Sequence, residues 1–431
     1  MARIALTTWG SHGDVDPFLG LALGLRARGH DVTIATLEYF RSLVTGQGIR
    51  FHPIRPEVNP TDADIVRQIM DGRRGTEFLL RQLIFPAVEA MYEDLCGVLE
   101  GVDLVVSHPL TMAAPIYAQQ RGLAWASVVL APMSFFSRYD VPVLPPAPWL
   151  KSLERYARWP GTLIVSLGKS ATGRWPTQIY ALRQRLGLPK GANPVFDGQH
   201  SPRLVLAMYS RVLGAPQADW PPNVEVTGHM FHDAPHGAGL SAEVEAFLDA
   251  GPAPVVFTLG SSAVLVAGDF WRESIEAVRQ LGCRAIMLVG PGNIESIRAL
   301  LPPELLPSRE SAPRVMVIEG APHSWLMPRA SVVVQQCGIG TMSQSLRSGR
   351  PMLAVPHAHD QPDNAYRAAQ LGMARQIYPS RYRARRVASE LRRLQDDPSY
   401  VAAAQRTAAV VRSERGVEAA CDALEERFDL R

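Results

Sequence analysis

The sequence has few cysteines, and their spacing excludes two classes of small-domain architecture. Its four cysteines, Cys96, Cys283, Cys337 and Cys421, lie far apart and form no CxxC pair. Neither a disulfide framework nor a zinc cluster is therefore indicated. A reducing, cytoplasmic location fits this pattern best.

The sequence also lacks an excess of charge and a long apolar run. It has 44 Lys and Arg against 41 Asp and Glu, a formal net charge of +3, whereas nucleic-acid binders concentrate basic residues. The N-terminus shows no basic region, apolar core and cleavage site of a signal peptide. The longest uncharged stretches, near 104–120 and 122–137, are too interrupted to span a bilayer. We expect no nucleic-acid partner and at most peripheral membrane contact.

What the sequence does contain is an alternation of apolar strand-like runs and segments of helical period. The runs are RIALTTW, DVTIAT, DLVVSHP and ASVVLAP in the first half, then LVLAMYS, and later PVVFTLGS, CRAIMLVG, RVMVIEG, SVVVQQC and PMLAVPH. This rhythm predicts an α/β fold with two domains, each built on a parallel sheet. We place the first domain at 1–215, a Pro- and Gly-rich linker at 216–240, the second domain at 241–405 and a C-terminal helix at 406–431.

Parallel sheets bind ligands at the carboxyl ends of their strands, so the turn GSHGDVDPF after the first strand is informative. Asp16, just before Pro17, is expected to cap the following helix. Asp14 lies in the turn itself, where its carboxylate can project into a cleft. The letters DVD also match a metal-binding DxD motif, but a helix cap accounts for the second Asp, so we expect no metal. His12 is expected to be solvated.

Two turns of the second domain are suited to an anion. The turn after VVFTL offers hydroxyls and main-chain N–H groups at Ser261 and Ser262, although such turns are common. The turn after VVVQQ opens a helix, whose N-terminus carries about half a positive charge, with Gly338, Gly340 and Thr341. Tight strand–helix packing explains these glycines equally well. The Walker lysine and the full GxGxxG fingerprint are missing, which argues against P-loop ATPases and ordinary dinucleotide dehydrogenases.

The next loop, in PMLAVPHAHDQPDNA, carries Asp360 and Gln361. Side by side, a carboxylate and an amide suit neighbouring sugar hydroxyls. Their alternative role is to form the turn and cap the helix before Pro362. A phosphate-type turn followed by a hydroxyl-binding pair on consecutive loops of one sheet favours a sugar nucleotide.

Taken in order, the motifs GSHGDVDPFLGLA, DWPPNVEVTGH, LGSS and QQCGIGTMSQSLRSGRPMLAVPHAHDQPDNA resemble the family-1 glycosyltransferases of GT-B fold over nearly the whole chain. The pattern is most similar to bacterial enzymes that use dTDP-activated deoxysugars, such as rhamnosyltransferases acting on lipids or flavonoids. The resemblance implies two Rossmann-like domains facing each other across a cleft, with the acceptor on the first and the nucleotide sugar on the second. It also implies an inverting transfer that needs no metal or other cofactor.

The resemblance also assigns residues to the donor. It places the sugar at Asp360 and Gln361 and the base at His323. The residues that it assigns to the diphosphate are Ser261, Ser262, Gln336, Gly338, Gly340 and Thr341. The family often has histidine where Gln336 stands, so a hydrogen bond is kept and a possible cation is lost. Plant members have a ribose-binding glutamate at the position of Gln344. The glutamine suits a 2′-deoxyribose and favours a dTDP over a UDP donor.

For catalysis, many members of the family have a histidine base in the opening turn and an aspartate after a later strand. Here the residue types are exchanged, with Asp14 in the turn and His108 after DLVVS. We expect Asp14 to be the base and His108 to orient it, although either can take the proton because such a pair titrates as a unit. A satisfied strand-end histidine is the other explanation of His108.

The acceptor is expected on apolar and aromatic side chains of 78–92 and 133–149, including Phe135, Phe136, Tyr139 and Trp149, although core packing explains them equally well. A phenolic acceptor such as a flavonoid is the first hypothesis, and a hydroxy-fatty-acid lipid is the second. Two other functions stay open: a nucleotide-sugar epimerase with the same donor site, and a non-catalytic helper of a partner transferase. The catalytic pair argues against the helper.

Overall fold

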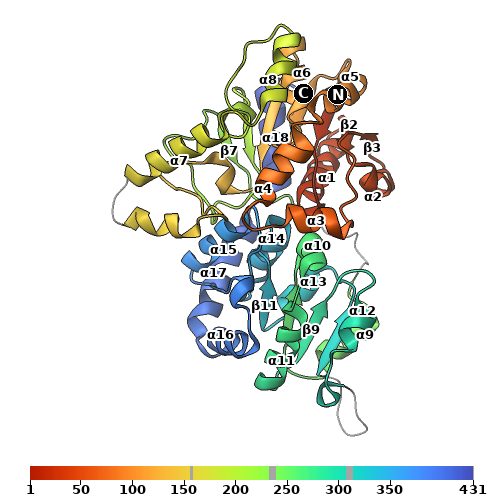
Figure 1. Cartoon of the computed structure of the whole chain (residues 1–431). Helices are drawn as coiled ribbons and strands as arrows, with labels where there is room; N and C mark the ends of the chain where they lie inside the picture. Colours follow the sequence, from red (N-terminus) through yellow and green to blue (C-terminus); the bar gives the residue numbers. More distant parts are fainter. Residues whose placement is uncertain (156–158, 233–238, 307–313, 431) are drawn as a thin grey trace. The chain divides into compact units, whose positions relative to one another are not determined.

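The computed structural model describes residues 1–155, 159–232, 239–306 and 314–430, and it divides into two compact units (Figure 1). The first unit combines Met1–His232 with Glu414–Arg431, and the second is Asp233–Ser413. Each unit is a parallel α/β domain, which confirms the predicted fold class. Residues 233–238 of the predicted linker 216–240, and residue 431, lie outside the described residues.

The first unit contains a sheet of seven strands in the order β3-β2-β1-β4-β5-β6-β7, in which all neighbouring strands are parallel. The strands are β1 (Arg3–Thr7), β2 (Asp31–Thr36), β3 (Arg50–Pro53), β4 (Leu104–Ser107), β5 (Ala124–Val129), β6 (Val205–Ala207) and β7 (Val224–Val226).

Helices surround this sheet. They are α1 (His12–Ala27), α2 (Arg41–Gly46), α3 (Ala63–Ile69), α4 (Gly75–Phe78), α5 (Val88–Leu99), α6 (Ala113–Arg121), α7 (Trp159–Thr172), α8 (Thr177–Arg185) and α18 (Gly416–Phe428). The 3₁₀-helical segments are η1 (Glu38–Phe40), η3 (Pro132–Phe135), η4 (Pro148–Arg155) and η5 (Asp197–Gln199), and η2 (Leu79–Ile84) is a π-helix.

The second unit contains a sheet of six parallel strands in the order β10-β9-β8-β11-β12-β13. The strands are β8 (Val255–Thr258), β9 (Ala285–Leu288), β10 (Val315–Ile318), β11 (Val332–Gln335), β12 (Met352–Ala354) and β13 (Ala374–Gln376). The helices are α9 (Ala242–Asp249), α10 (Gly260–Ala263), α11 (Phe270–Leu281), α12 (Ile294–Arg298), α13 (His323–Leu326), α14 (Ile339–Ser348), α15 (Gln361–Gln370), α16 (Ala384–Asp396) and α17 (Pro398–Ser413). Shorter segments are η6 (Val264–Val266), η7 (Pro303–Leu305), η8 (Met327–Arg329) and η9 (Pro379–Arg381).

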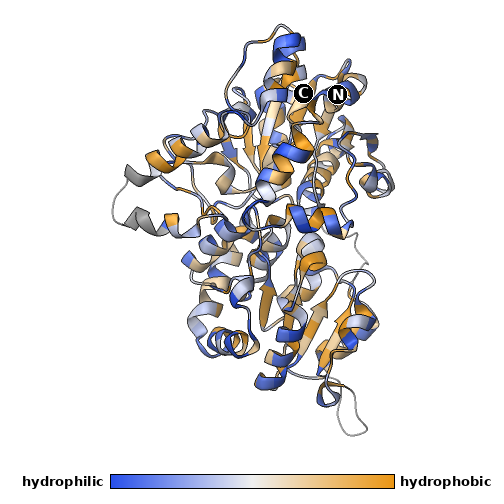
Figure 2. Cartoon of the chain, viewed as in Figure 1, coloured by the Kyte–Doolittle hydropathy of each residue, from blue (hydrophilic) through white to orange (hydrophobic). Residues whose placement is uncertain are grey.

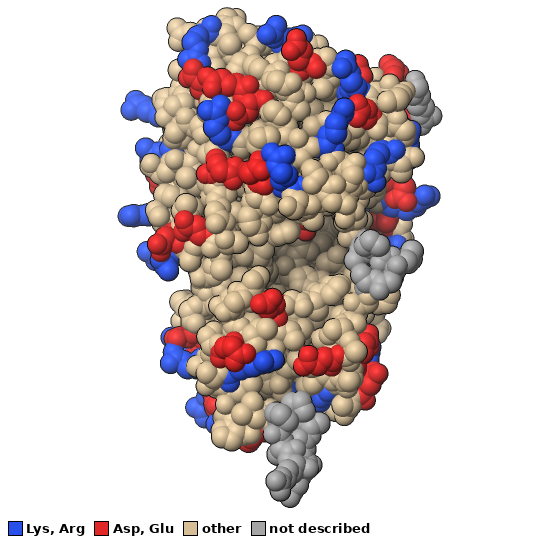
Figure 3. Space-filling view, turned by 90° about the vertical axis from the view of Figure 1, so that its right-hand side faces the viewer, with Lys and Arg blue, Asp and Glu red and all other residues tan. Residues whose placement is uncertain are grey.

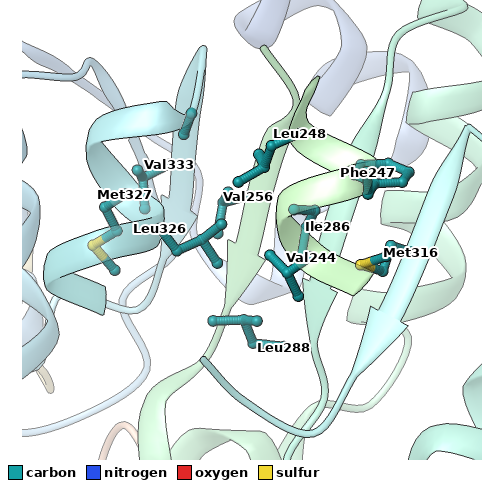
Figure 4. Close-up of a cluster of buried hydrophobic side chains, with 11 residues drawn as sticks. Val244, Phe247, Leu248, Val256, Ile286, Leu288, Met316, Leu326, Met327 and Val333 are labelled. Atoms are coloured by element: carbon teal, nitrogen blue, oxygen red, sulfur yellow. The ribbon is translucent and has the colours of Figure 1, made fainter. Parts of the chain in front are cut away.

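The core of each unit lies between the apolar strands and the inward faces of the helices, and Figure 2 shows the strands as the most hydrophobic elements. In the second unit, α9 lays Val244, Phe247 and Leu248 on the sheet (Figure 4). The same cluster includes Leu326, at the end of α13, and Met327. The burial of these side chains holds α13 on the sheet, because apolar area removed from water contributes about 25 cal/mol per Å².

The C-terminal region differs from the prediction of one helix over 406–431. α17 ends at Ser413, and α18 begins at Gly416 and belongs to the first unit. Glu414 stands at the break, and its Oε1 accepts hydrogen bonds from the Ser210 hydroxyl at 2.9 Å and from the Arg211 N–H at 3.1 Å. These bonds attach the returning chain to the first unit at the end of β6.

Helix α18 packs along α1. Its Glu425 contacts His30 Nε2 at 3.0 Å and Arg28 Nη1 at 2.8 Å. Gly24 of α1 permits a close approach, because a Cβ at this position would lie 2.4 Å from Val417 Cγ1 and 3.1 Å from Cys421 Sγ. The last helix is therefore part of the first unit's packing, although the rest of that unit ends at His232.

The surface and the thiols agree with the composition. Acidic and basic side chains are interspersed on the face drawn in Figure 3. Cys96, Cys283, Cys337 and Cys421 are free thiols. Within the described residues, no helix is both long enough and apolar enough to cross a membrane.

We predict that Gly24→Ala destabilises the first unit by about 1–3 kcal/mol, because the added methyl overpacks the contact between α1 and α18. Gly46→Ala is the matched control, since nothing lies within 4 Å of a Cβ there. Urea unfolding of both variants measures the effect. Equal stability of the two variants would show that α18 does not pack tightly on α1.

Candidate functional site

In the first sheet, the chain changes its direction of travel between β1 and β4. Strands β2 and β3 lie on one side of β1, and β4 to β7 lie on the other. Such switch points are where open parallel sheets bind ligands. Thr7, the last residue of β1, pairs with Ser107, the last residue of β4, and the His108 N–H donates to the Thr7 carbonyl at 2.9 Å. The turn after β1 and the segment after β4 therefore begin side by side.

The turn after β1 passes into α1 about one helical turn earlier than predicted. The prediction that Asp16 caps the helix is wrong, because Ser11 is the N-cap and Pro17 lies inside α1. The Ser11 hydroxyl accepts a first-turn N–H at 3.3 Å, and Asp14 Oδ2 accepts the Ser11 N–H at 2.7 Å. This reciprocal capping box satisfies two N–H groups that the helix start leaves without a partner.

Asp16 instead lies further along α1 and contacts His12. The His12 Nδ1 to Asp16 Oδ1 distance is 3.2 Å, and both side chains are about half exposed. The hydrogen bond to Asp16 raises the pKa of His12 above its usual value, although burial acts in the opposite direction. The His12 ring also meets Phe40 edge-on at 5.1 Å. His12, which we expected to be solvated, therefore has two partners on the protein.

The structure brings Asp14 and His108 together. His108 Nε2 lies 3.4 Å from Asp14 Oδ1, with side-chain exposures of 5% for His108 and 29% for Asp14. Asp14 Oδ2 also accepts the Ser11 hydroxyl at 3.1 Å. On the other side of the ring, His108 Nδ1 accepts the Leu110 N–H at 3.2 Å. In the neutral ring the proton is therefore on Nε2 and is directed at Asp14.

These contacts set the charge of Asp14. Burial alone raises the pKa of the carboxyl group, but the hydrogen bond and charge of His108 and the two bonds from Ser11 outweigh it. The pKa of Asp14 therefore lies below its usual range, and the side chain is a carboxylate at neutral pH. Because a carboxylate has about four lone-pair sites, its partly exposed oxygen can accept a further hydroxyl.

The DxD motif does not act as a unit in this structure. Asp14 contacts Ser11 and His108, whereas Asp16 contacts His12. In the described ranges, no group of three or more His, Cys, Asp or Glu side chains is placed to hold a metal ion.

The second sheet has its own switch point, between β8 and β11. Strands β9 and β10 lie on one side of β8, and β11 to β13 lie on the other. Three predicted donor segments follow the neighbouring strands β8, β11 and β12, and all leave the sheet at the same edge. The sequence analysis expected these loops to be neighbours, and the observed strand order makes them so.

Gly260 lies where the first two of these segments come into contact. It adopts φ +64°, and a Cβ there would lie 2.2 Å from Gln336 Nε2 and 3.2 Å from Thr341 Oγ1. Glycine tolerates both the positive φ and the close approach. Ser261 and Ser262 follow in the short helix α10, the first exposed and the second partly buried.

The segment after β11 presents amides and an open helix end. Gln336 is 6% exposed, and its Nε2 donates to Thr341 Oγ1 at 3.3 Å. Gly338 is the N-cap of α14 and, as a glycine, has no side chain to cap the helix. The first-turn N–H groups of α14, including that of Gly340, have no intrahelical partner. This end of the helix is suited to an anion.

Three buried amide oxygens in this region lack a hydrogen-bond partner among the described residues: those of Gln336, Gln344 and Asn364. A buried polar group without a partner is costly, typically by about 1–3 kcal/mol. Turning the Gln336 amide over would let its oxygen accept the Thr341 hydroxyl and would direct its N–H groups at the unpaired position. Such an amide can donate to a phosphate oxygen.

Asp360 and Gln361 hold the loop after β12. Gln361 Oε1 accepts the N–H groups of His357 at 2.8 Å and Ala358 at 3.3 Å. Asp360 is the N-cap residue of α15, and its Oδ2 accepts the Asn364 amide at 2.7 Å. Gln361 thus performs the turn-forming role that we weighed as the alternative to sugar binding, whereas the Asp360 side chain makes no capping hydrogen bond to the backbone of α15.

Sequence reasoning missed Asn364. Its Nδ2 donates to the Cys337 carbonyl at 2.9 Å as well as to Asp360. Cys337 has φ +67°, an uncommon conformation for a residue with a side chain. Asn364 therefore links the segments after β11 and β12, and the only sequence signal was its place one turn into the last helix of the motif.

His323 is the first residue of α13, which packs against α14. Burial lowers the pKa of His323 to about 4, so the ring is neutral at pH 7 and can donate one hydrogen bond and accept another. These properties suit a contact with a nucleobase.

The predicted acceptor segments 78–92 and 133–149 are only partly free to bind. Phe135 stacks on Trp220 with ring centroids 4.0 Å apart, and Phe136 packs against Phe196 at 4.5 Å. Tyr139 and Trp149 are 46% and 63% exposed. Core packing therefore explains the two phenylalanines, whereas Tyr139, which contacts Arg138, and Trp149 are exposed.

Comparison with known proteins identifies consistent relatives. Residues 4–117 match the glycosyltransferase family 28 N-terminal domain. The chain is 32% identical to O-mycaminosyltylonolide 6-deoxyallosyltransferase of Streptomyces fradiae, over 100% of this chain and 98% of that protein.

Solved structures share the fold along the whole chain. The glycosyltransferase of kitacinnamycin matches with a TM-score of 0.73 and 22% identity, over 99% of both chains. Spinosyn rhamnosyltransferase SpnG complexed with thymidine diphosphate matches with a TM-score of 0.65 and 17% identity, over 99% of this chain and 100% of that one.

We predict that Asp14→Asn is less stable than the wild type by about 1 kcal/mol at pH 7, because the variant weakens the capping box and loses the charge beside His108. The folded pKa of Asp14 is lowered, so its contribution is complete above the unfolded value of about 3.9 and disappears as the pH falls through the folded pKa. Urea unfolding at pH 7, 4 and 2.5 measures it.

Asp16→Asn is the control for this measurement, because its half-exposed contact with His12 should contribute under about 0.5 kcal/mol. A stability difference for Asp14→Asn that stays constant from pH 7 to pH 2.5 contradicts the assigned charge.

Proposed function

The chain belongs to the GT-B glycosyltransferases with a family 28 N-terminal domain, and we propose that it transfers a deoxysugar, such as rhamnose, from a dTDP-linked donor to a hydroxyl of a small apolar or phenolic acceptor. Two names support the donor class: the Streptomyces fradiae relative is a 6-deoxyallosyltransferase, and SpnG is a rhamnosyltransferase complexed with thymidine diphosphate. The observation that carries the proposal is the meeting of three loop segments at the open N-terminus of α14.

In this proposal, the second unit binds the donor diphosphate. Negative charge develops on the departing nucleotide, and it would be stabilised by the first-turn N–H groups of α14 and, once its amide is turned over, by the N–H groups of Gln336. The main chain thus supplies the stabilising charge, and the transfer needs no metal ion. His323 lies against the base, and Gln344 lies near the deoxyribose.

The first unit supplies the proton acceptor. Because His108 Nε2 directs its proton at Asp14, the lone pairs that remain for a substrate hydroxyl belong to the carboxylate. In this proposal His108 therefore orients Asp14 and stabilises its charge.

A carboxylate with a lowered pKa is a weak base, which fits a late proton transfer. The acceptor hydroxyl becomes acidic as its oxygen bonds to the anomeric carbon, and only then does its proton pass to Asp14. The oxygen attacks from the face opposite the nucleotide, the bond from the anomeric carbon to the diphosphate oxygen breaks, and the configuration inverts.

We predict that Asp14→Asn lowers kcat by about 10²–10⁴-fold, the usual contribution of a general base, while the Kd for dTDP is unchanged. His108→Ala should lower kcat less, because the carboxylate remains. Asp16→Asn should keep near-normal turnover. The assay measures transfer from a dTDP-deoxysugar to a panel of phenolic and apolar alcohols, and near-normal turnover of Asp14→Asn would show that another group takes the proton. Conversion of the donor sugar without any acceptor would instead favour an epimerase.

We also predict that dTDP binds more tightly than UDP and that Gly260→Ala weakens dTDP binding at least tenfold, because the added methyl collides with the Gln336 amide. Gly268→Ala is the matched control: it has a similar positive φ of +52°, and nothing lies within 4 Å of a Cβ there. Calorimetric titration of the wild type and both variants separates the collision from backbone strain. Equal losses in both variants would place the nucleotide elsewhere.

A further inference from the structure

The first unit contains a cavity of about 190 Å³ that the proposed transfer does not use. It lies against β4 and β5 and is bounded by α6, α8 and the residues from Gly191 to Pro202 (α6 and α8 are labelled in Figure 1). His108 forms part of its wall, and Gly191 and Ala192 lie at exposed positions of the lining. An apolar cavity of about 150 Å³ admits a benzene ring, so this cavity can take a ring with a small substituent.

Most of the inner wall is apolar. Ile116 of α6, Trp125 of β5 and Ile179 of α8 line it, and they are 1%, 6% and 3% exposed. Trp125 Nε1 already donates to the Ser107 hydroxyl at 2.8 Å, so its ring offers only an apolar surface. This part of the cavity suits a ring or a short hydrocarbon chain.

One cation interrupts the apolar lining. Arg183 of α8 is 8% exposed, and it donates from Nε to the Pro189 carbonyl at 2.8 Å and from Nη2 to Gln119 Oε1 at 2.9 Å. Both acceptors are neutral, and within the described residues Arg183 forms no ion pair. Burial lowers its pKa, which reflects the cost of holding the charge in this position. A buried charge is normally paired, so the missing partner is an anion.

The backbone at Gly191 packs closely against this guanidinium. Gly191 adopts φ +75°, and a Cβ there would lie 3.1 Å from Cζ and from Nη2 of Arg183. The sequence Lys190-Gly191 thus passes over the guanidinium without a side chain in between.

A second polar group in the lining lacks a partner. Nδ1 of His200 is buried and has no hydrogen bond among the described residues. Burial lowers the pKa of His200 to about 4, so the neutral ring can donate one hydrogen bond to an oxygen. Arg183 thus contributes a charged group, and His200 a neutral ring, to the lining of one cavity.

We propose that this cavity is a binding site for a compact apolar carboxylic acid, with its carboxylate on Arg183 and its apolar body against Ile116, Trp125 and Ile179. The site needs neither the donor nor the second unit, so it does not depend on the proposed transfer. Because His108 forms part of the wall, the bound acid contacts the residue that orients Asp14.

Benzoate is the probe that matches this cavity in size and charge. In a ligand-observed NMR titration of the full chain, benzoate should bind the wild type, and benzamide, its neutral analogue, should bind at least tenfold more weakly. Arg183→Gln should weaken benzoate at least tenfold. Ala192→Trp, at an exposed part of the lining, should block entry without altering the core.

Arg185→Gln is the matched control, since it removes the same charge from an exposed, Glu89-paired position of the same helix. It should leave benzoate binding unchanged. Thermal unfolding shows whether each variant is folded. Equal binding of benzamide and benzoate, or unchanged benzoate binding in both Arg183→Gln and Ala192→Trp, would overturn the proposal. If the wild type binds benzoate but does not bind dTDP, the result would count against the proposed transfer and leave the benzoate site standing.

Discussion

The parallel pairing of β1 with β4 is the constraint on which the candidate site of the first unit depends. With Thr7 opposite Ser107, the turn that carries Asp14 and the segment that carries His108 must start beside each other. The capping box then fixes Asp14 at the start of α1, and the Leu110 N–H fixes the ring of His108. An ionised carboxylate beside a proton-bearing nitrogen follows from these local bonds. The chemistry therefore comes from strand order and helix start together.

In the second unit, strand order also brings functional groups together, but these groups are neutral. Its switch point brings together main-chain N–H groups and amides, and Gly260 allows two of the segments to touch. The unpaired amide oxygens can accept hydrogen bonds from hydroxyl groups of a ligand, and the main-chain N–H groups can donate to an anion. The N–H groups at the start of α14 are preformed dipoles suited to an anion, and they need no rearrangement as charge develops.

The interior strands and the neighbouring loops could be predicted from sequence, because buried parallel strands are continuous apolar runs and their order fixes which loops meet. Of the four edge strands, the buried apolar run of β10 could be predicted, but β3, β7 and β13 could not. Most of their residues are only partly buried or exposed, so they form no continuous apolar run. The cap was mispredicted because Asp-Pro and Ser-x-x-Asp are both valid helix starts, and only the fold selects one. The roles of Asn364 and of Arg183 depend on contacts between distant segments, which no local pattern encodes.

The return of the chain at Glu414 has a consequence for how the protein is made. The first unit obtains α18 only after the whole second unit has left the ribosome. Until then, the face of α1 around Gly24 is uncovered, and the nascent first unit exposes apolar surface to the cell. During translation, the second unit can close its own sheet before the first has all its parts. Chaperone dependence is thus expected of the earlier-synthesised unit rather than of the later one.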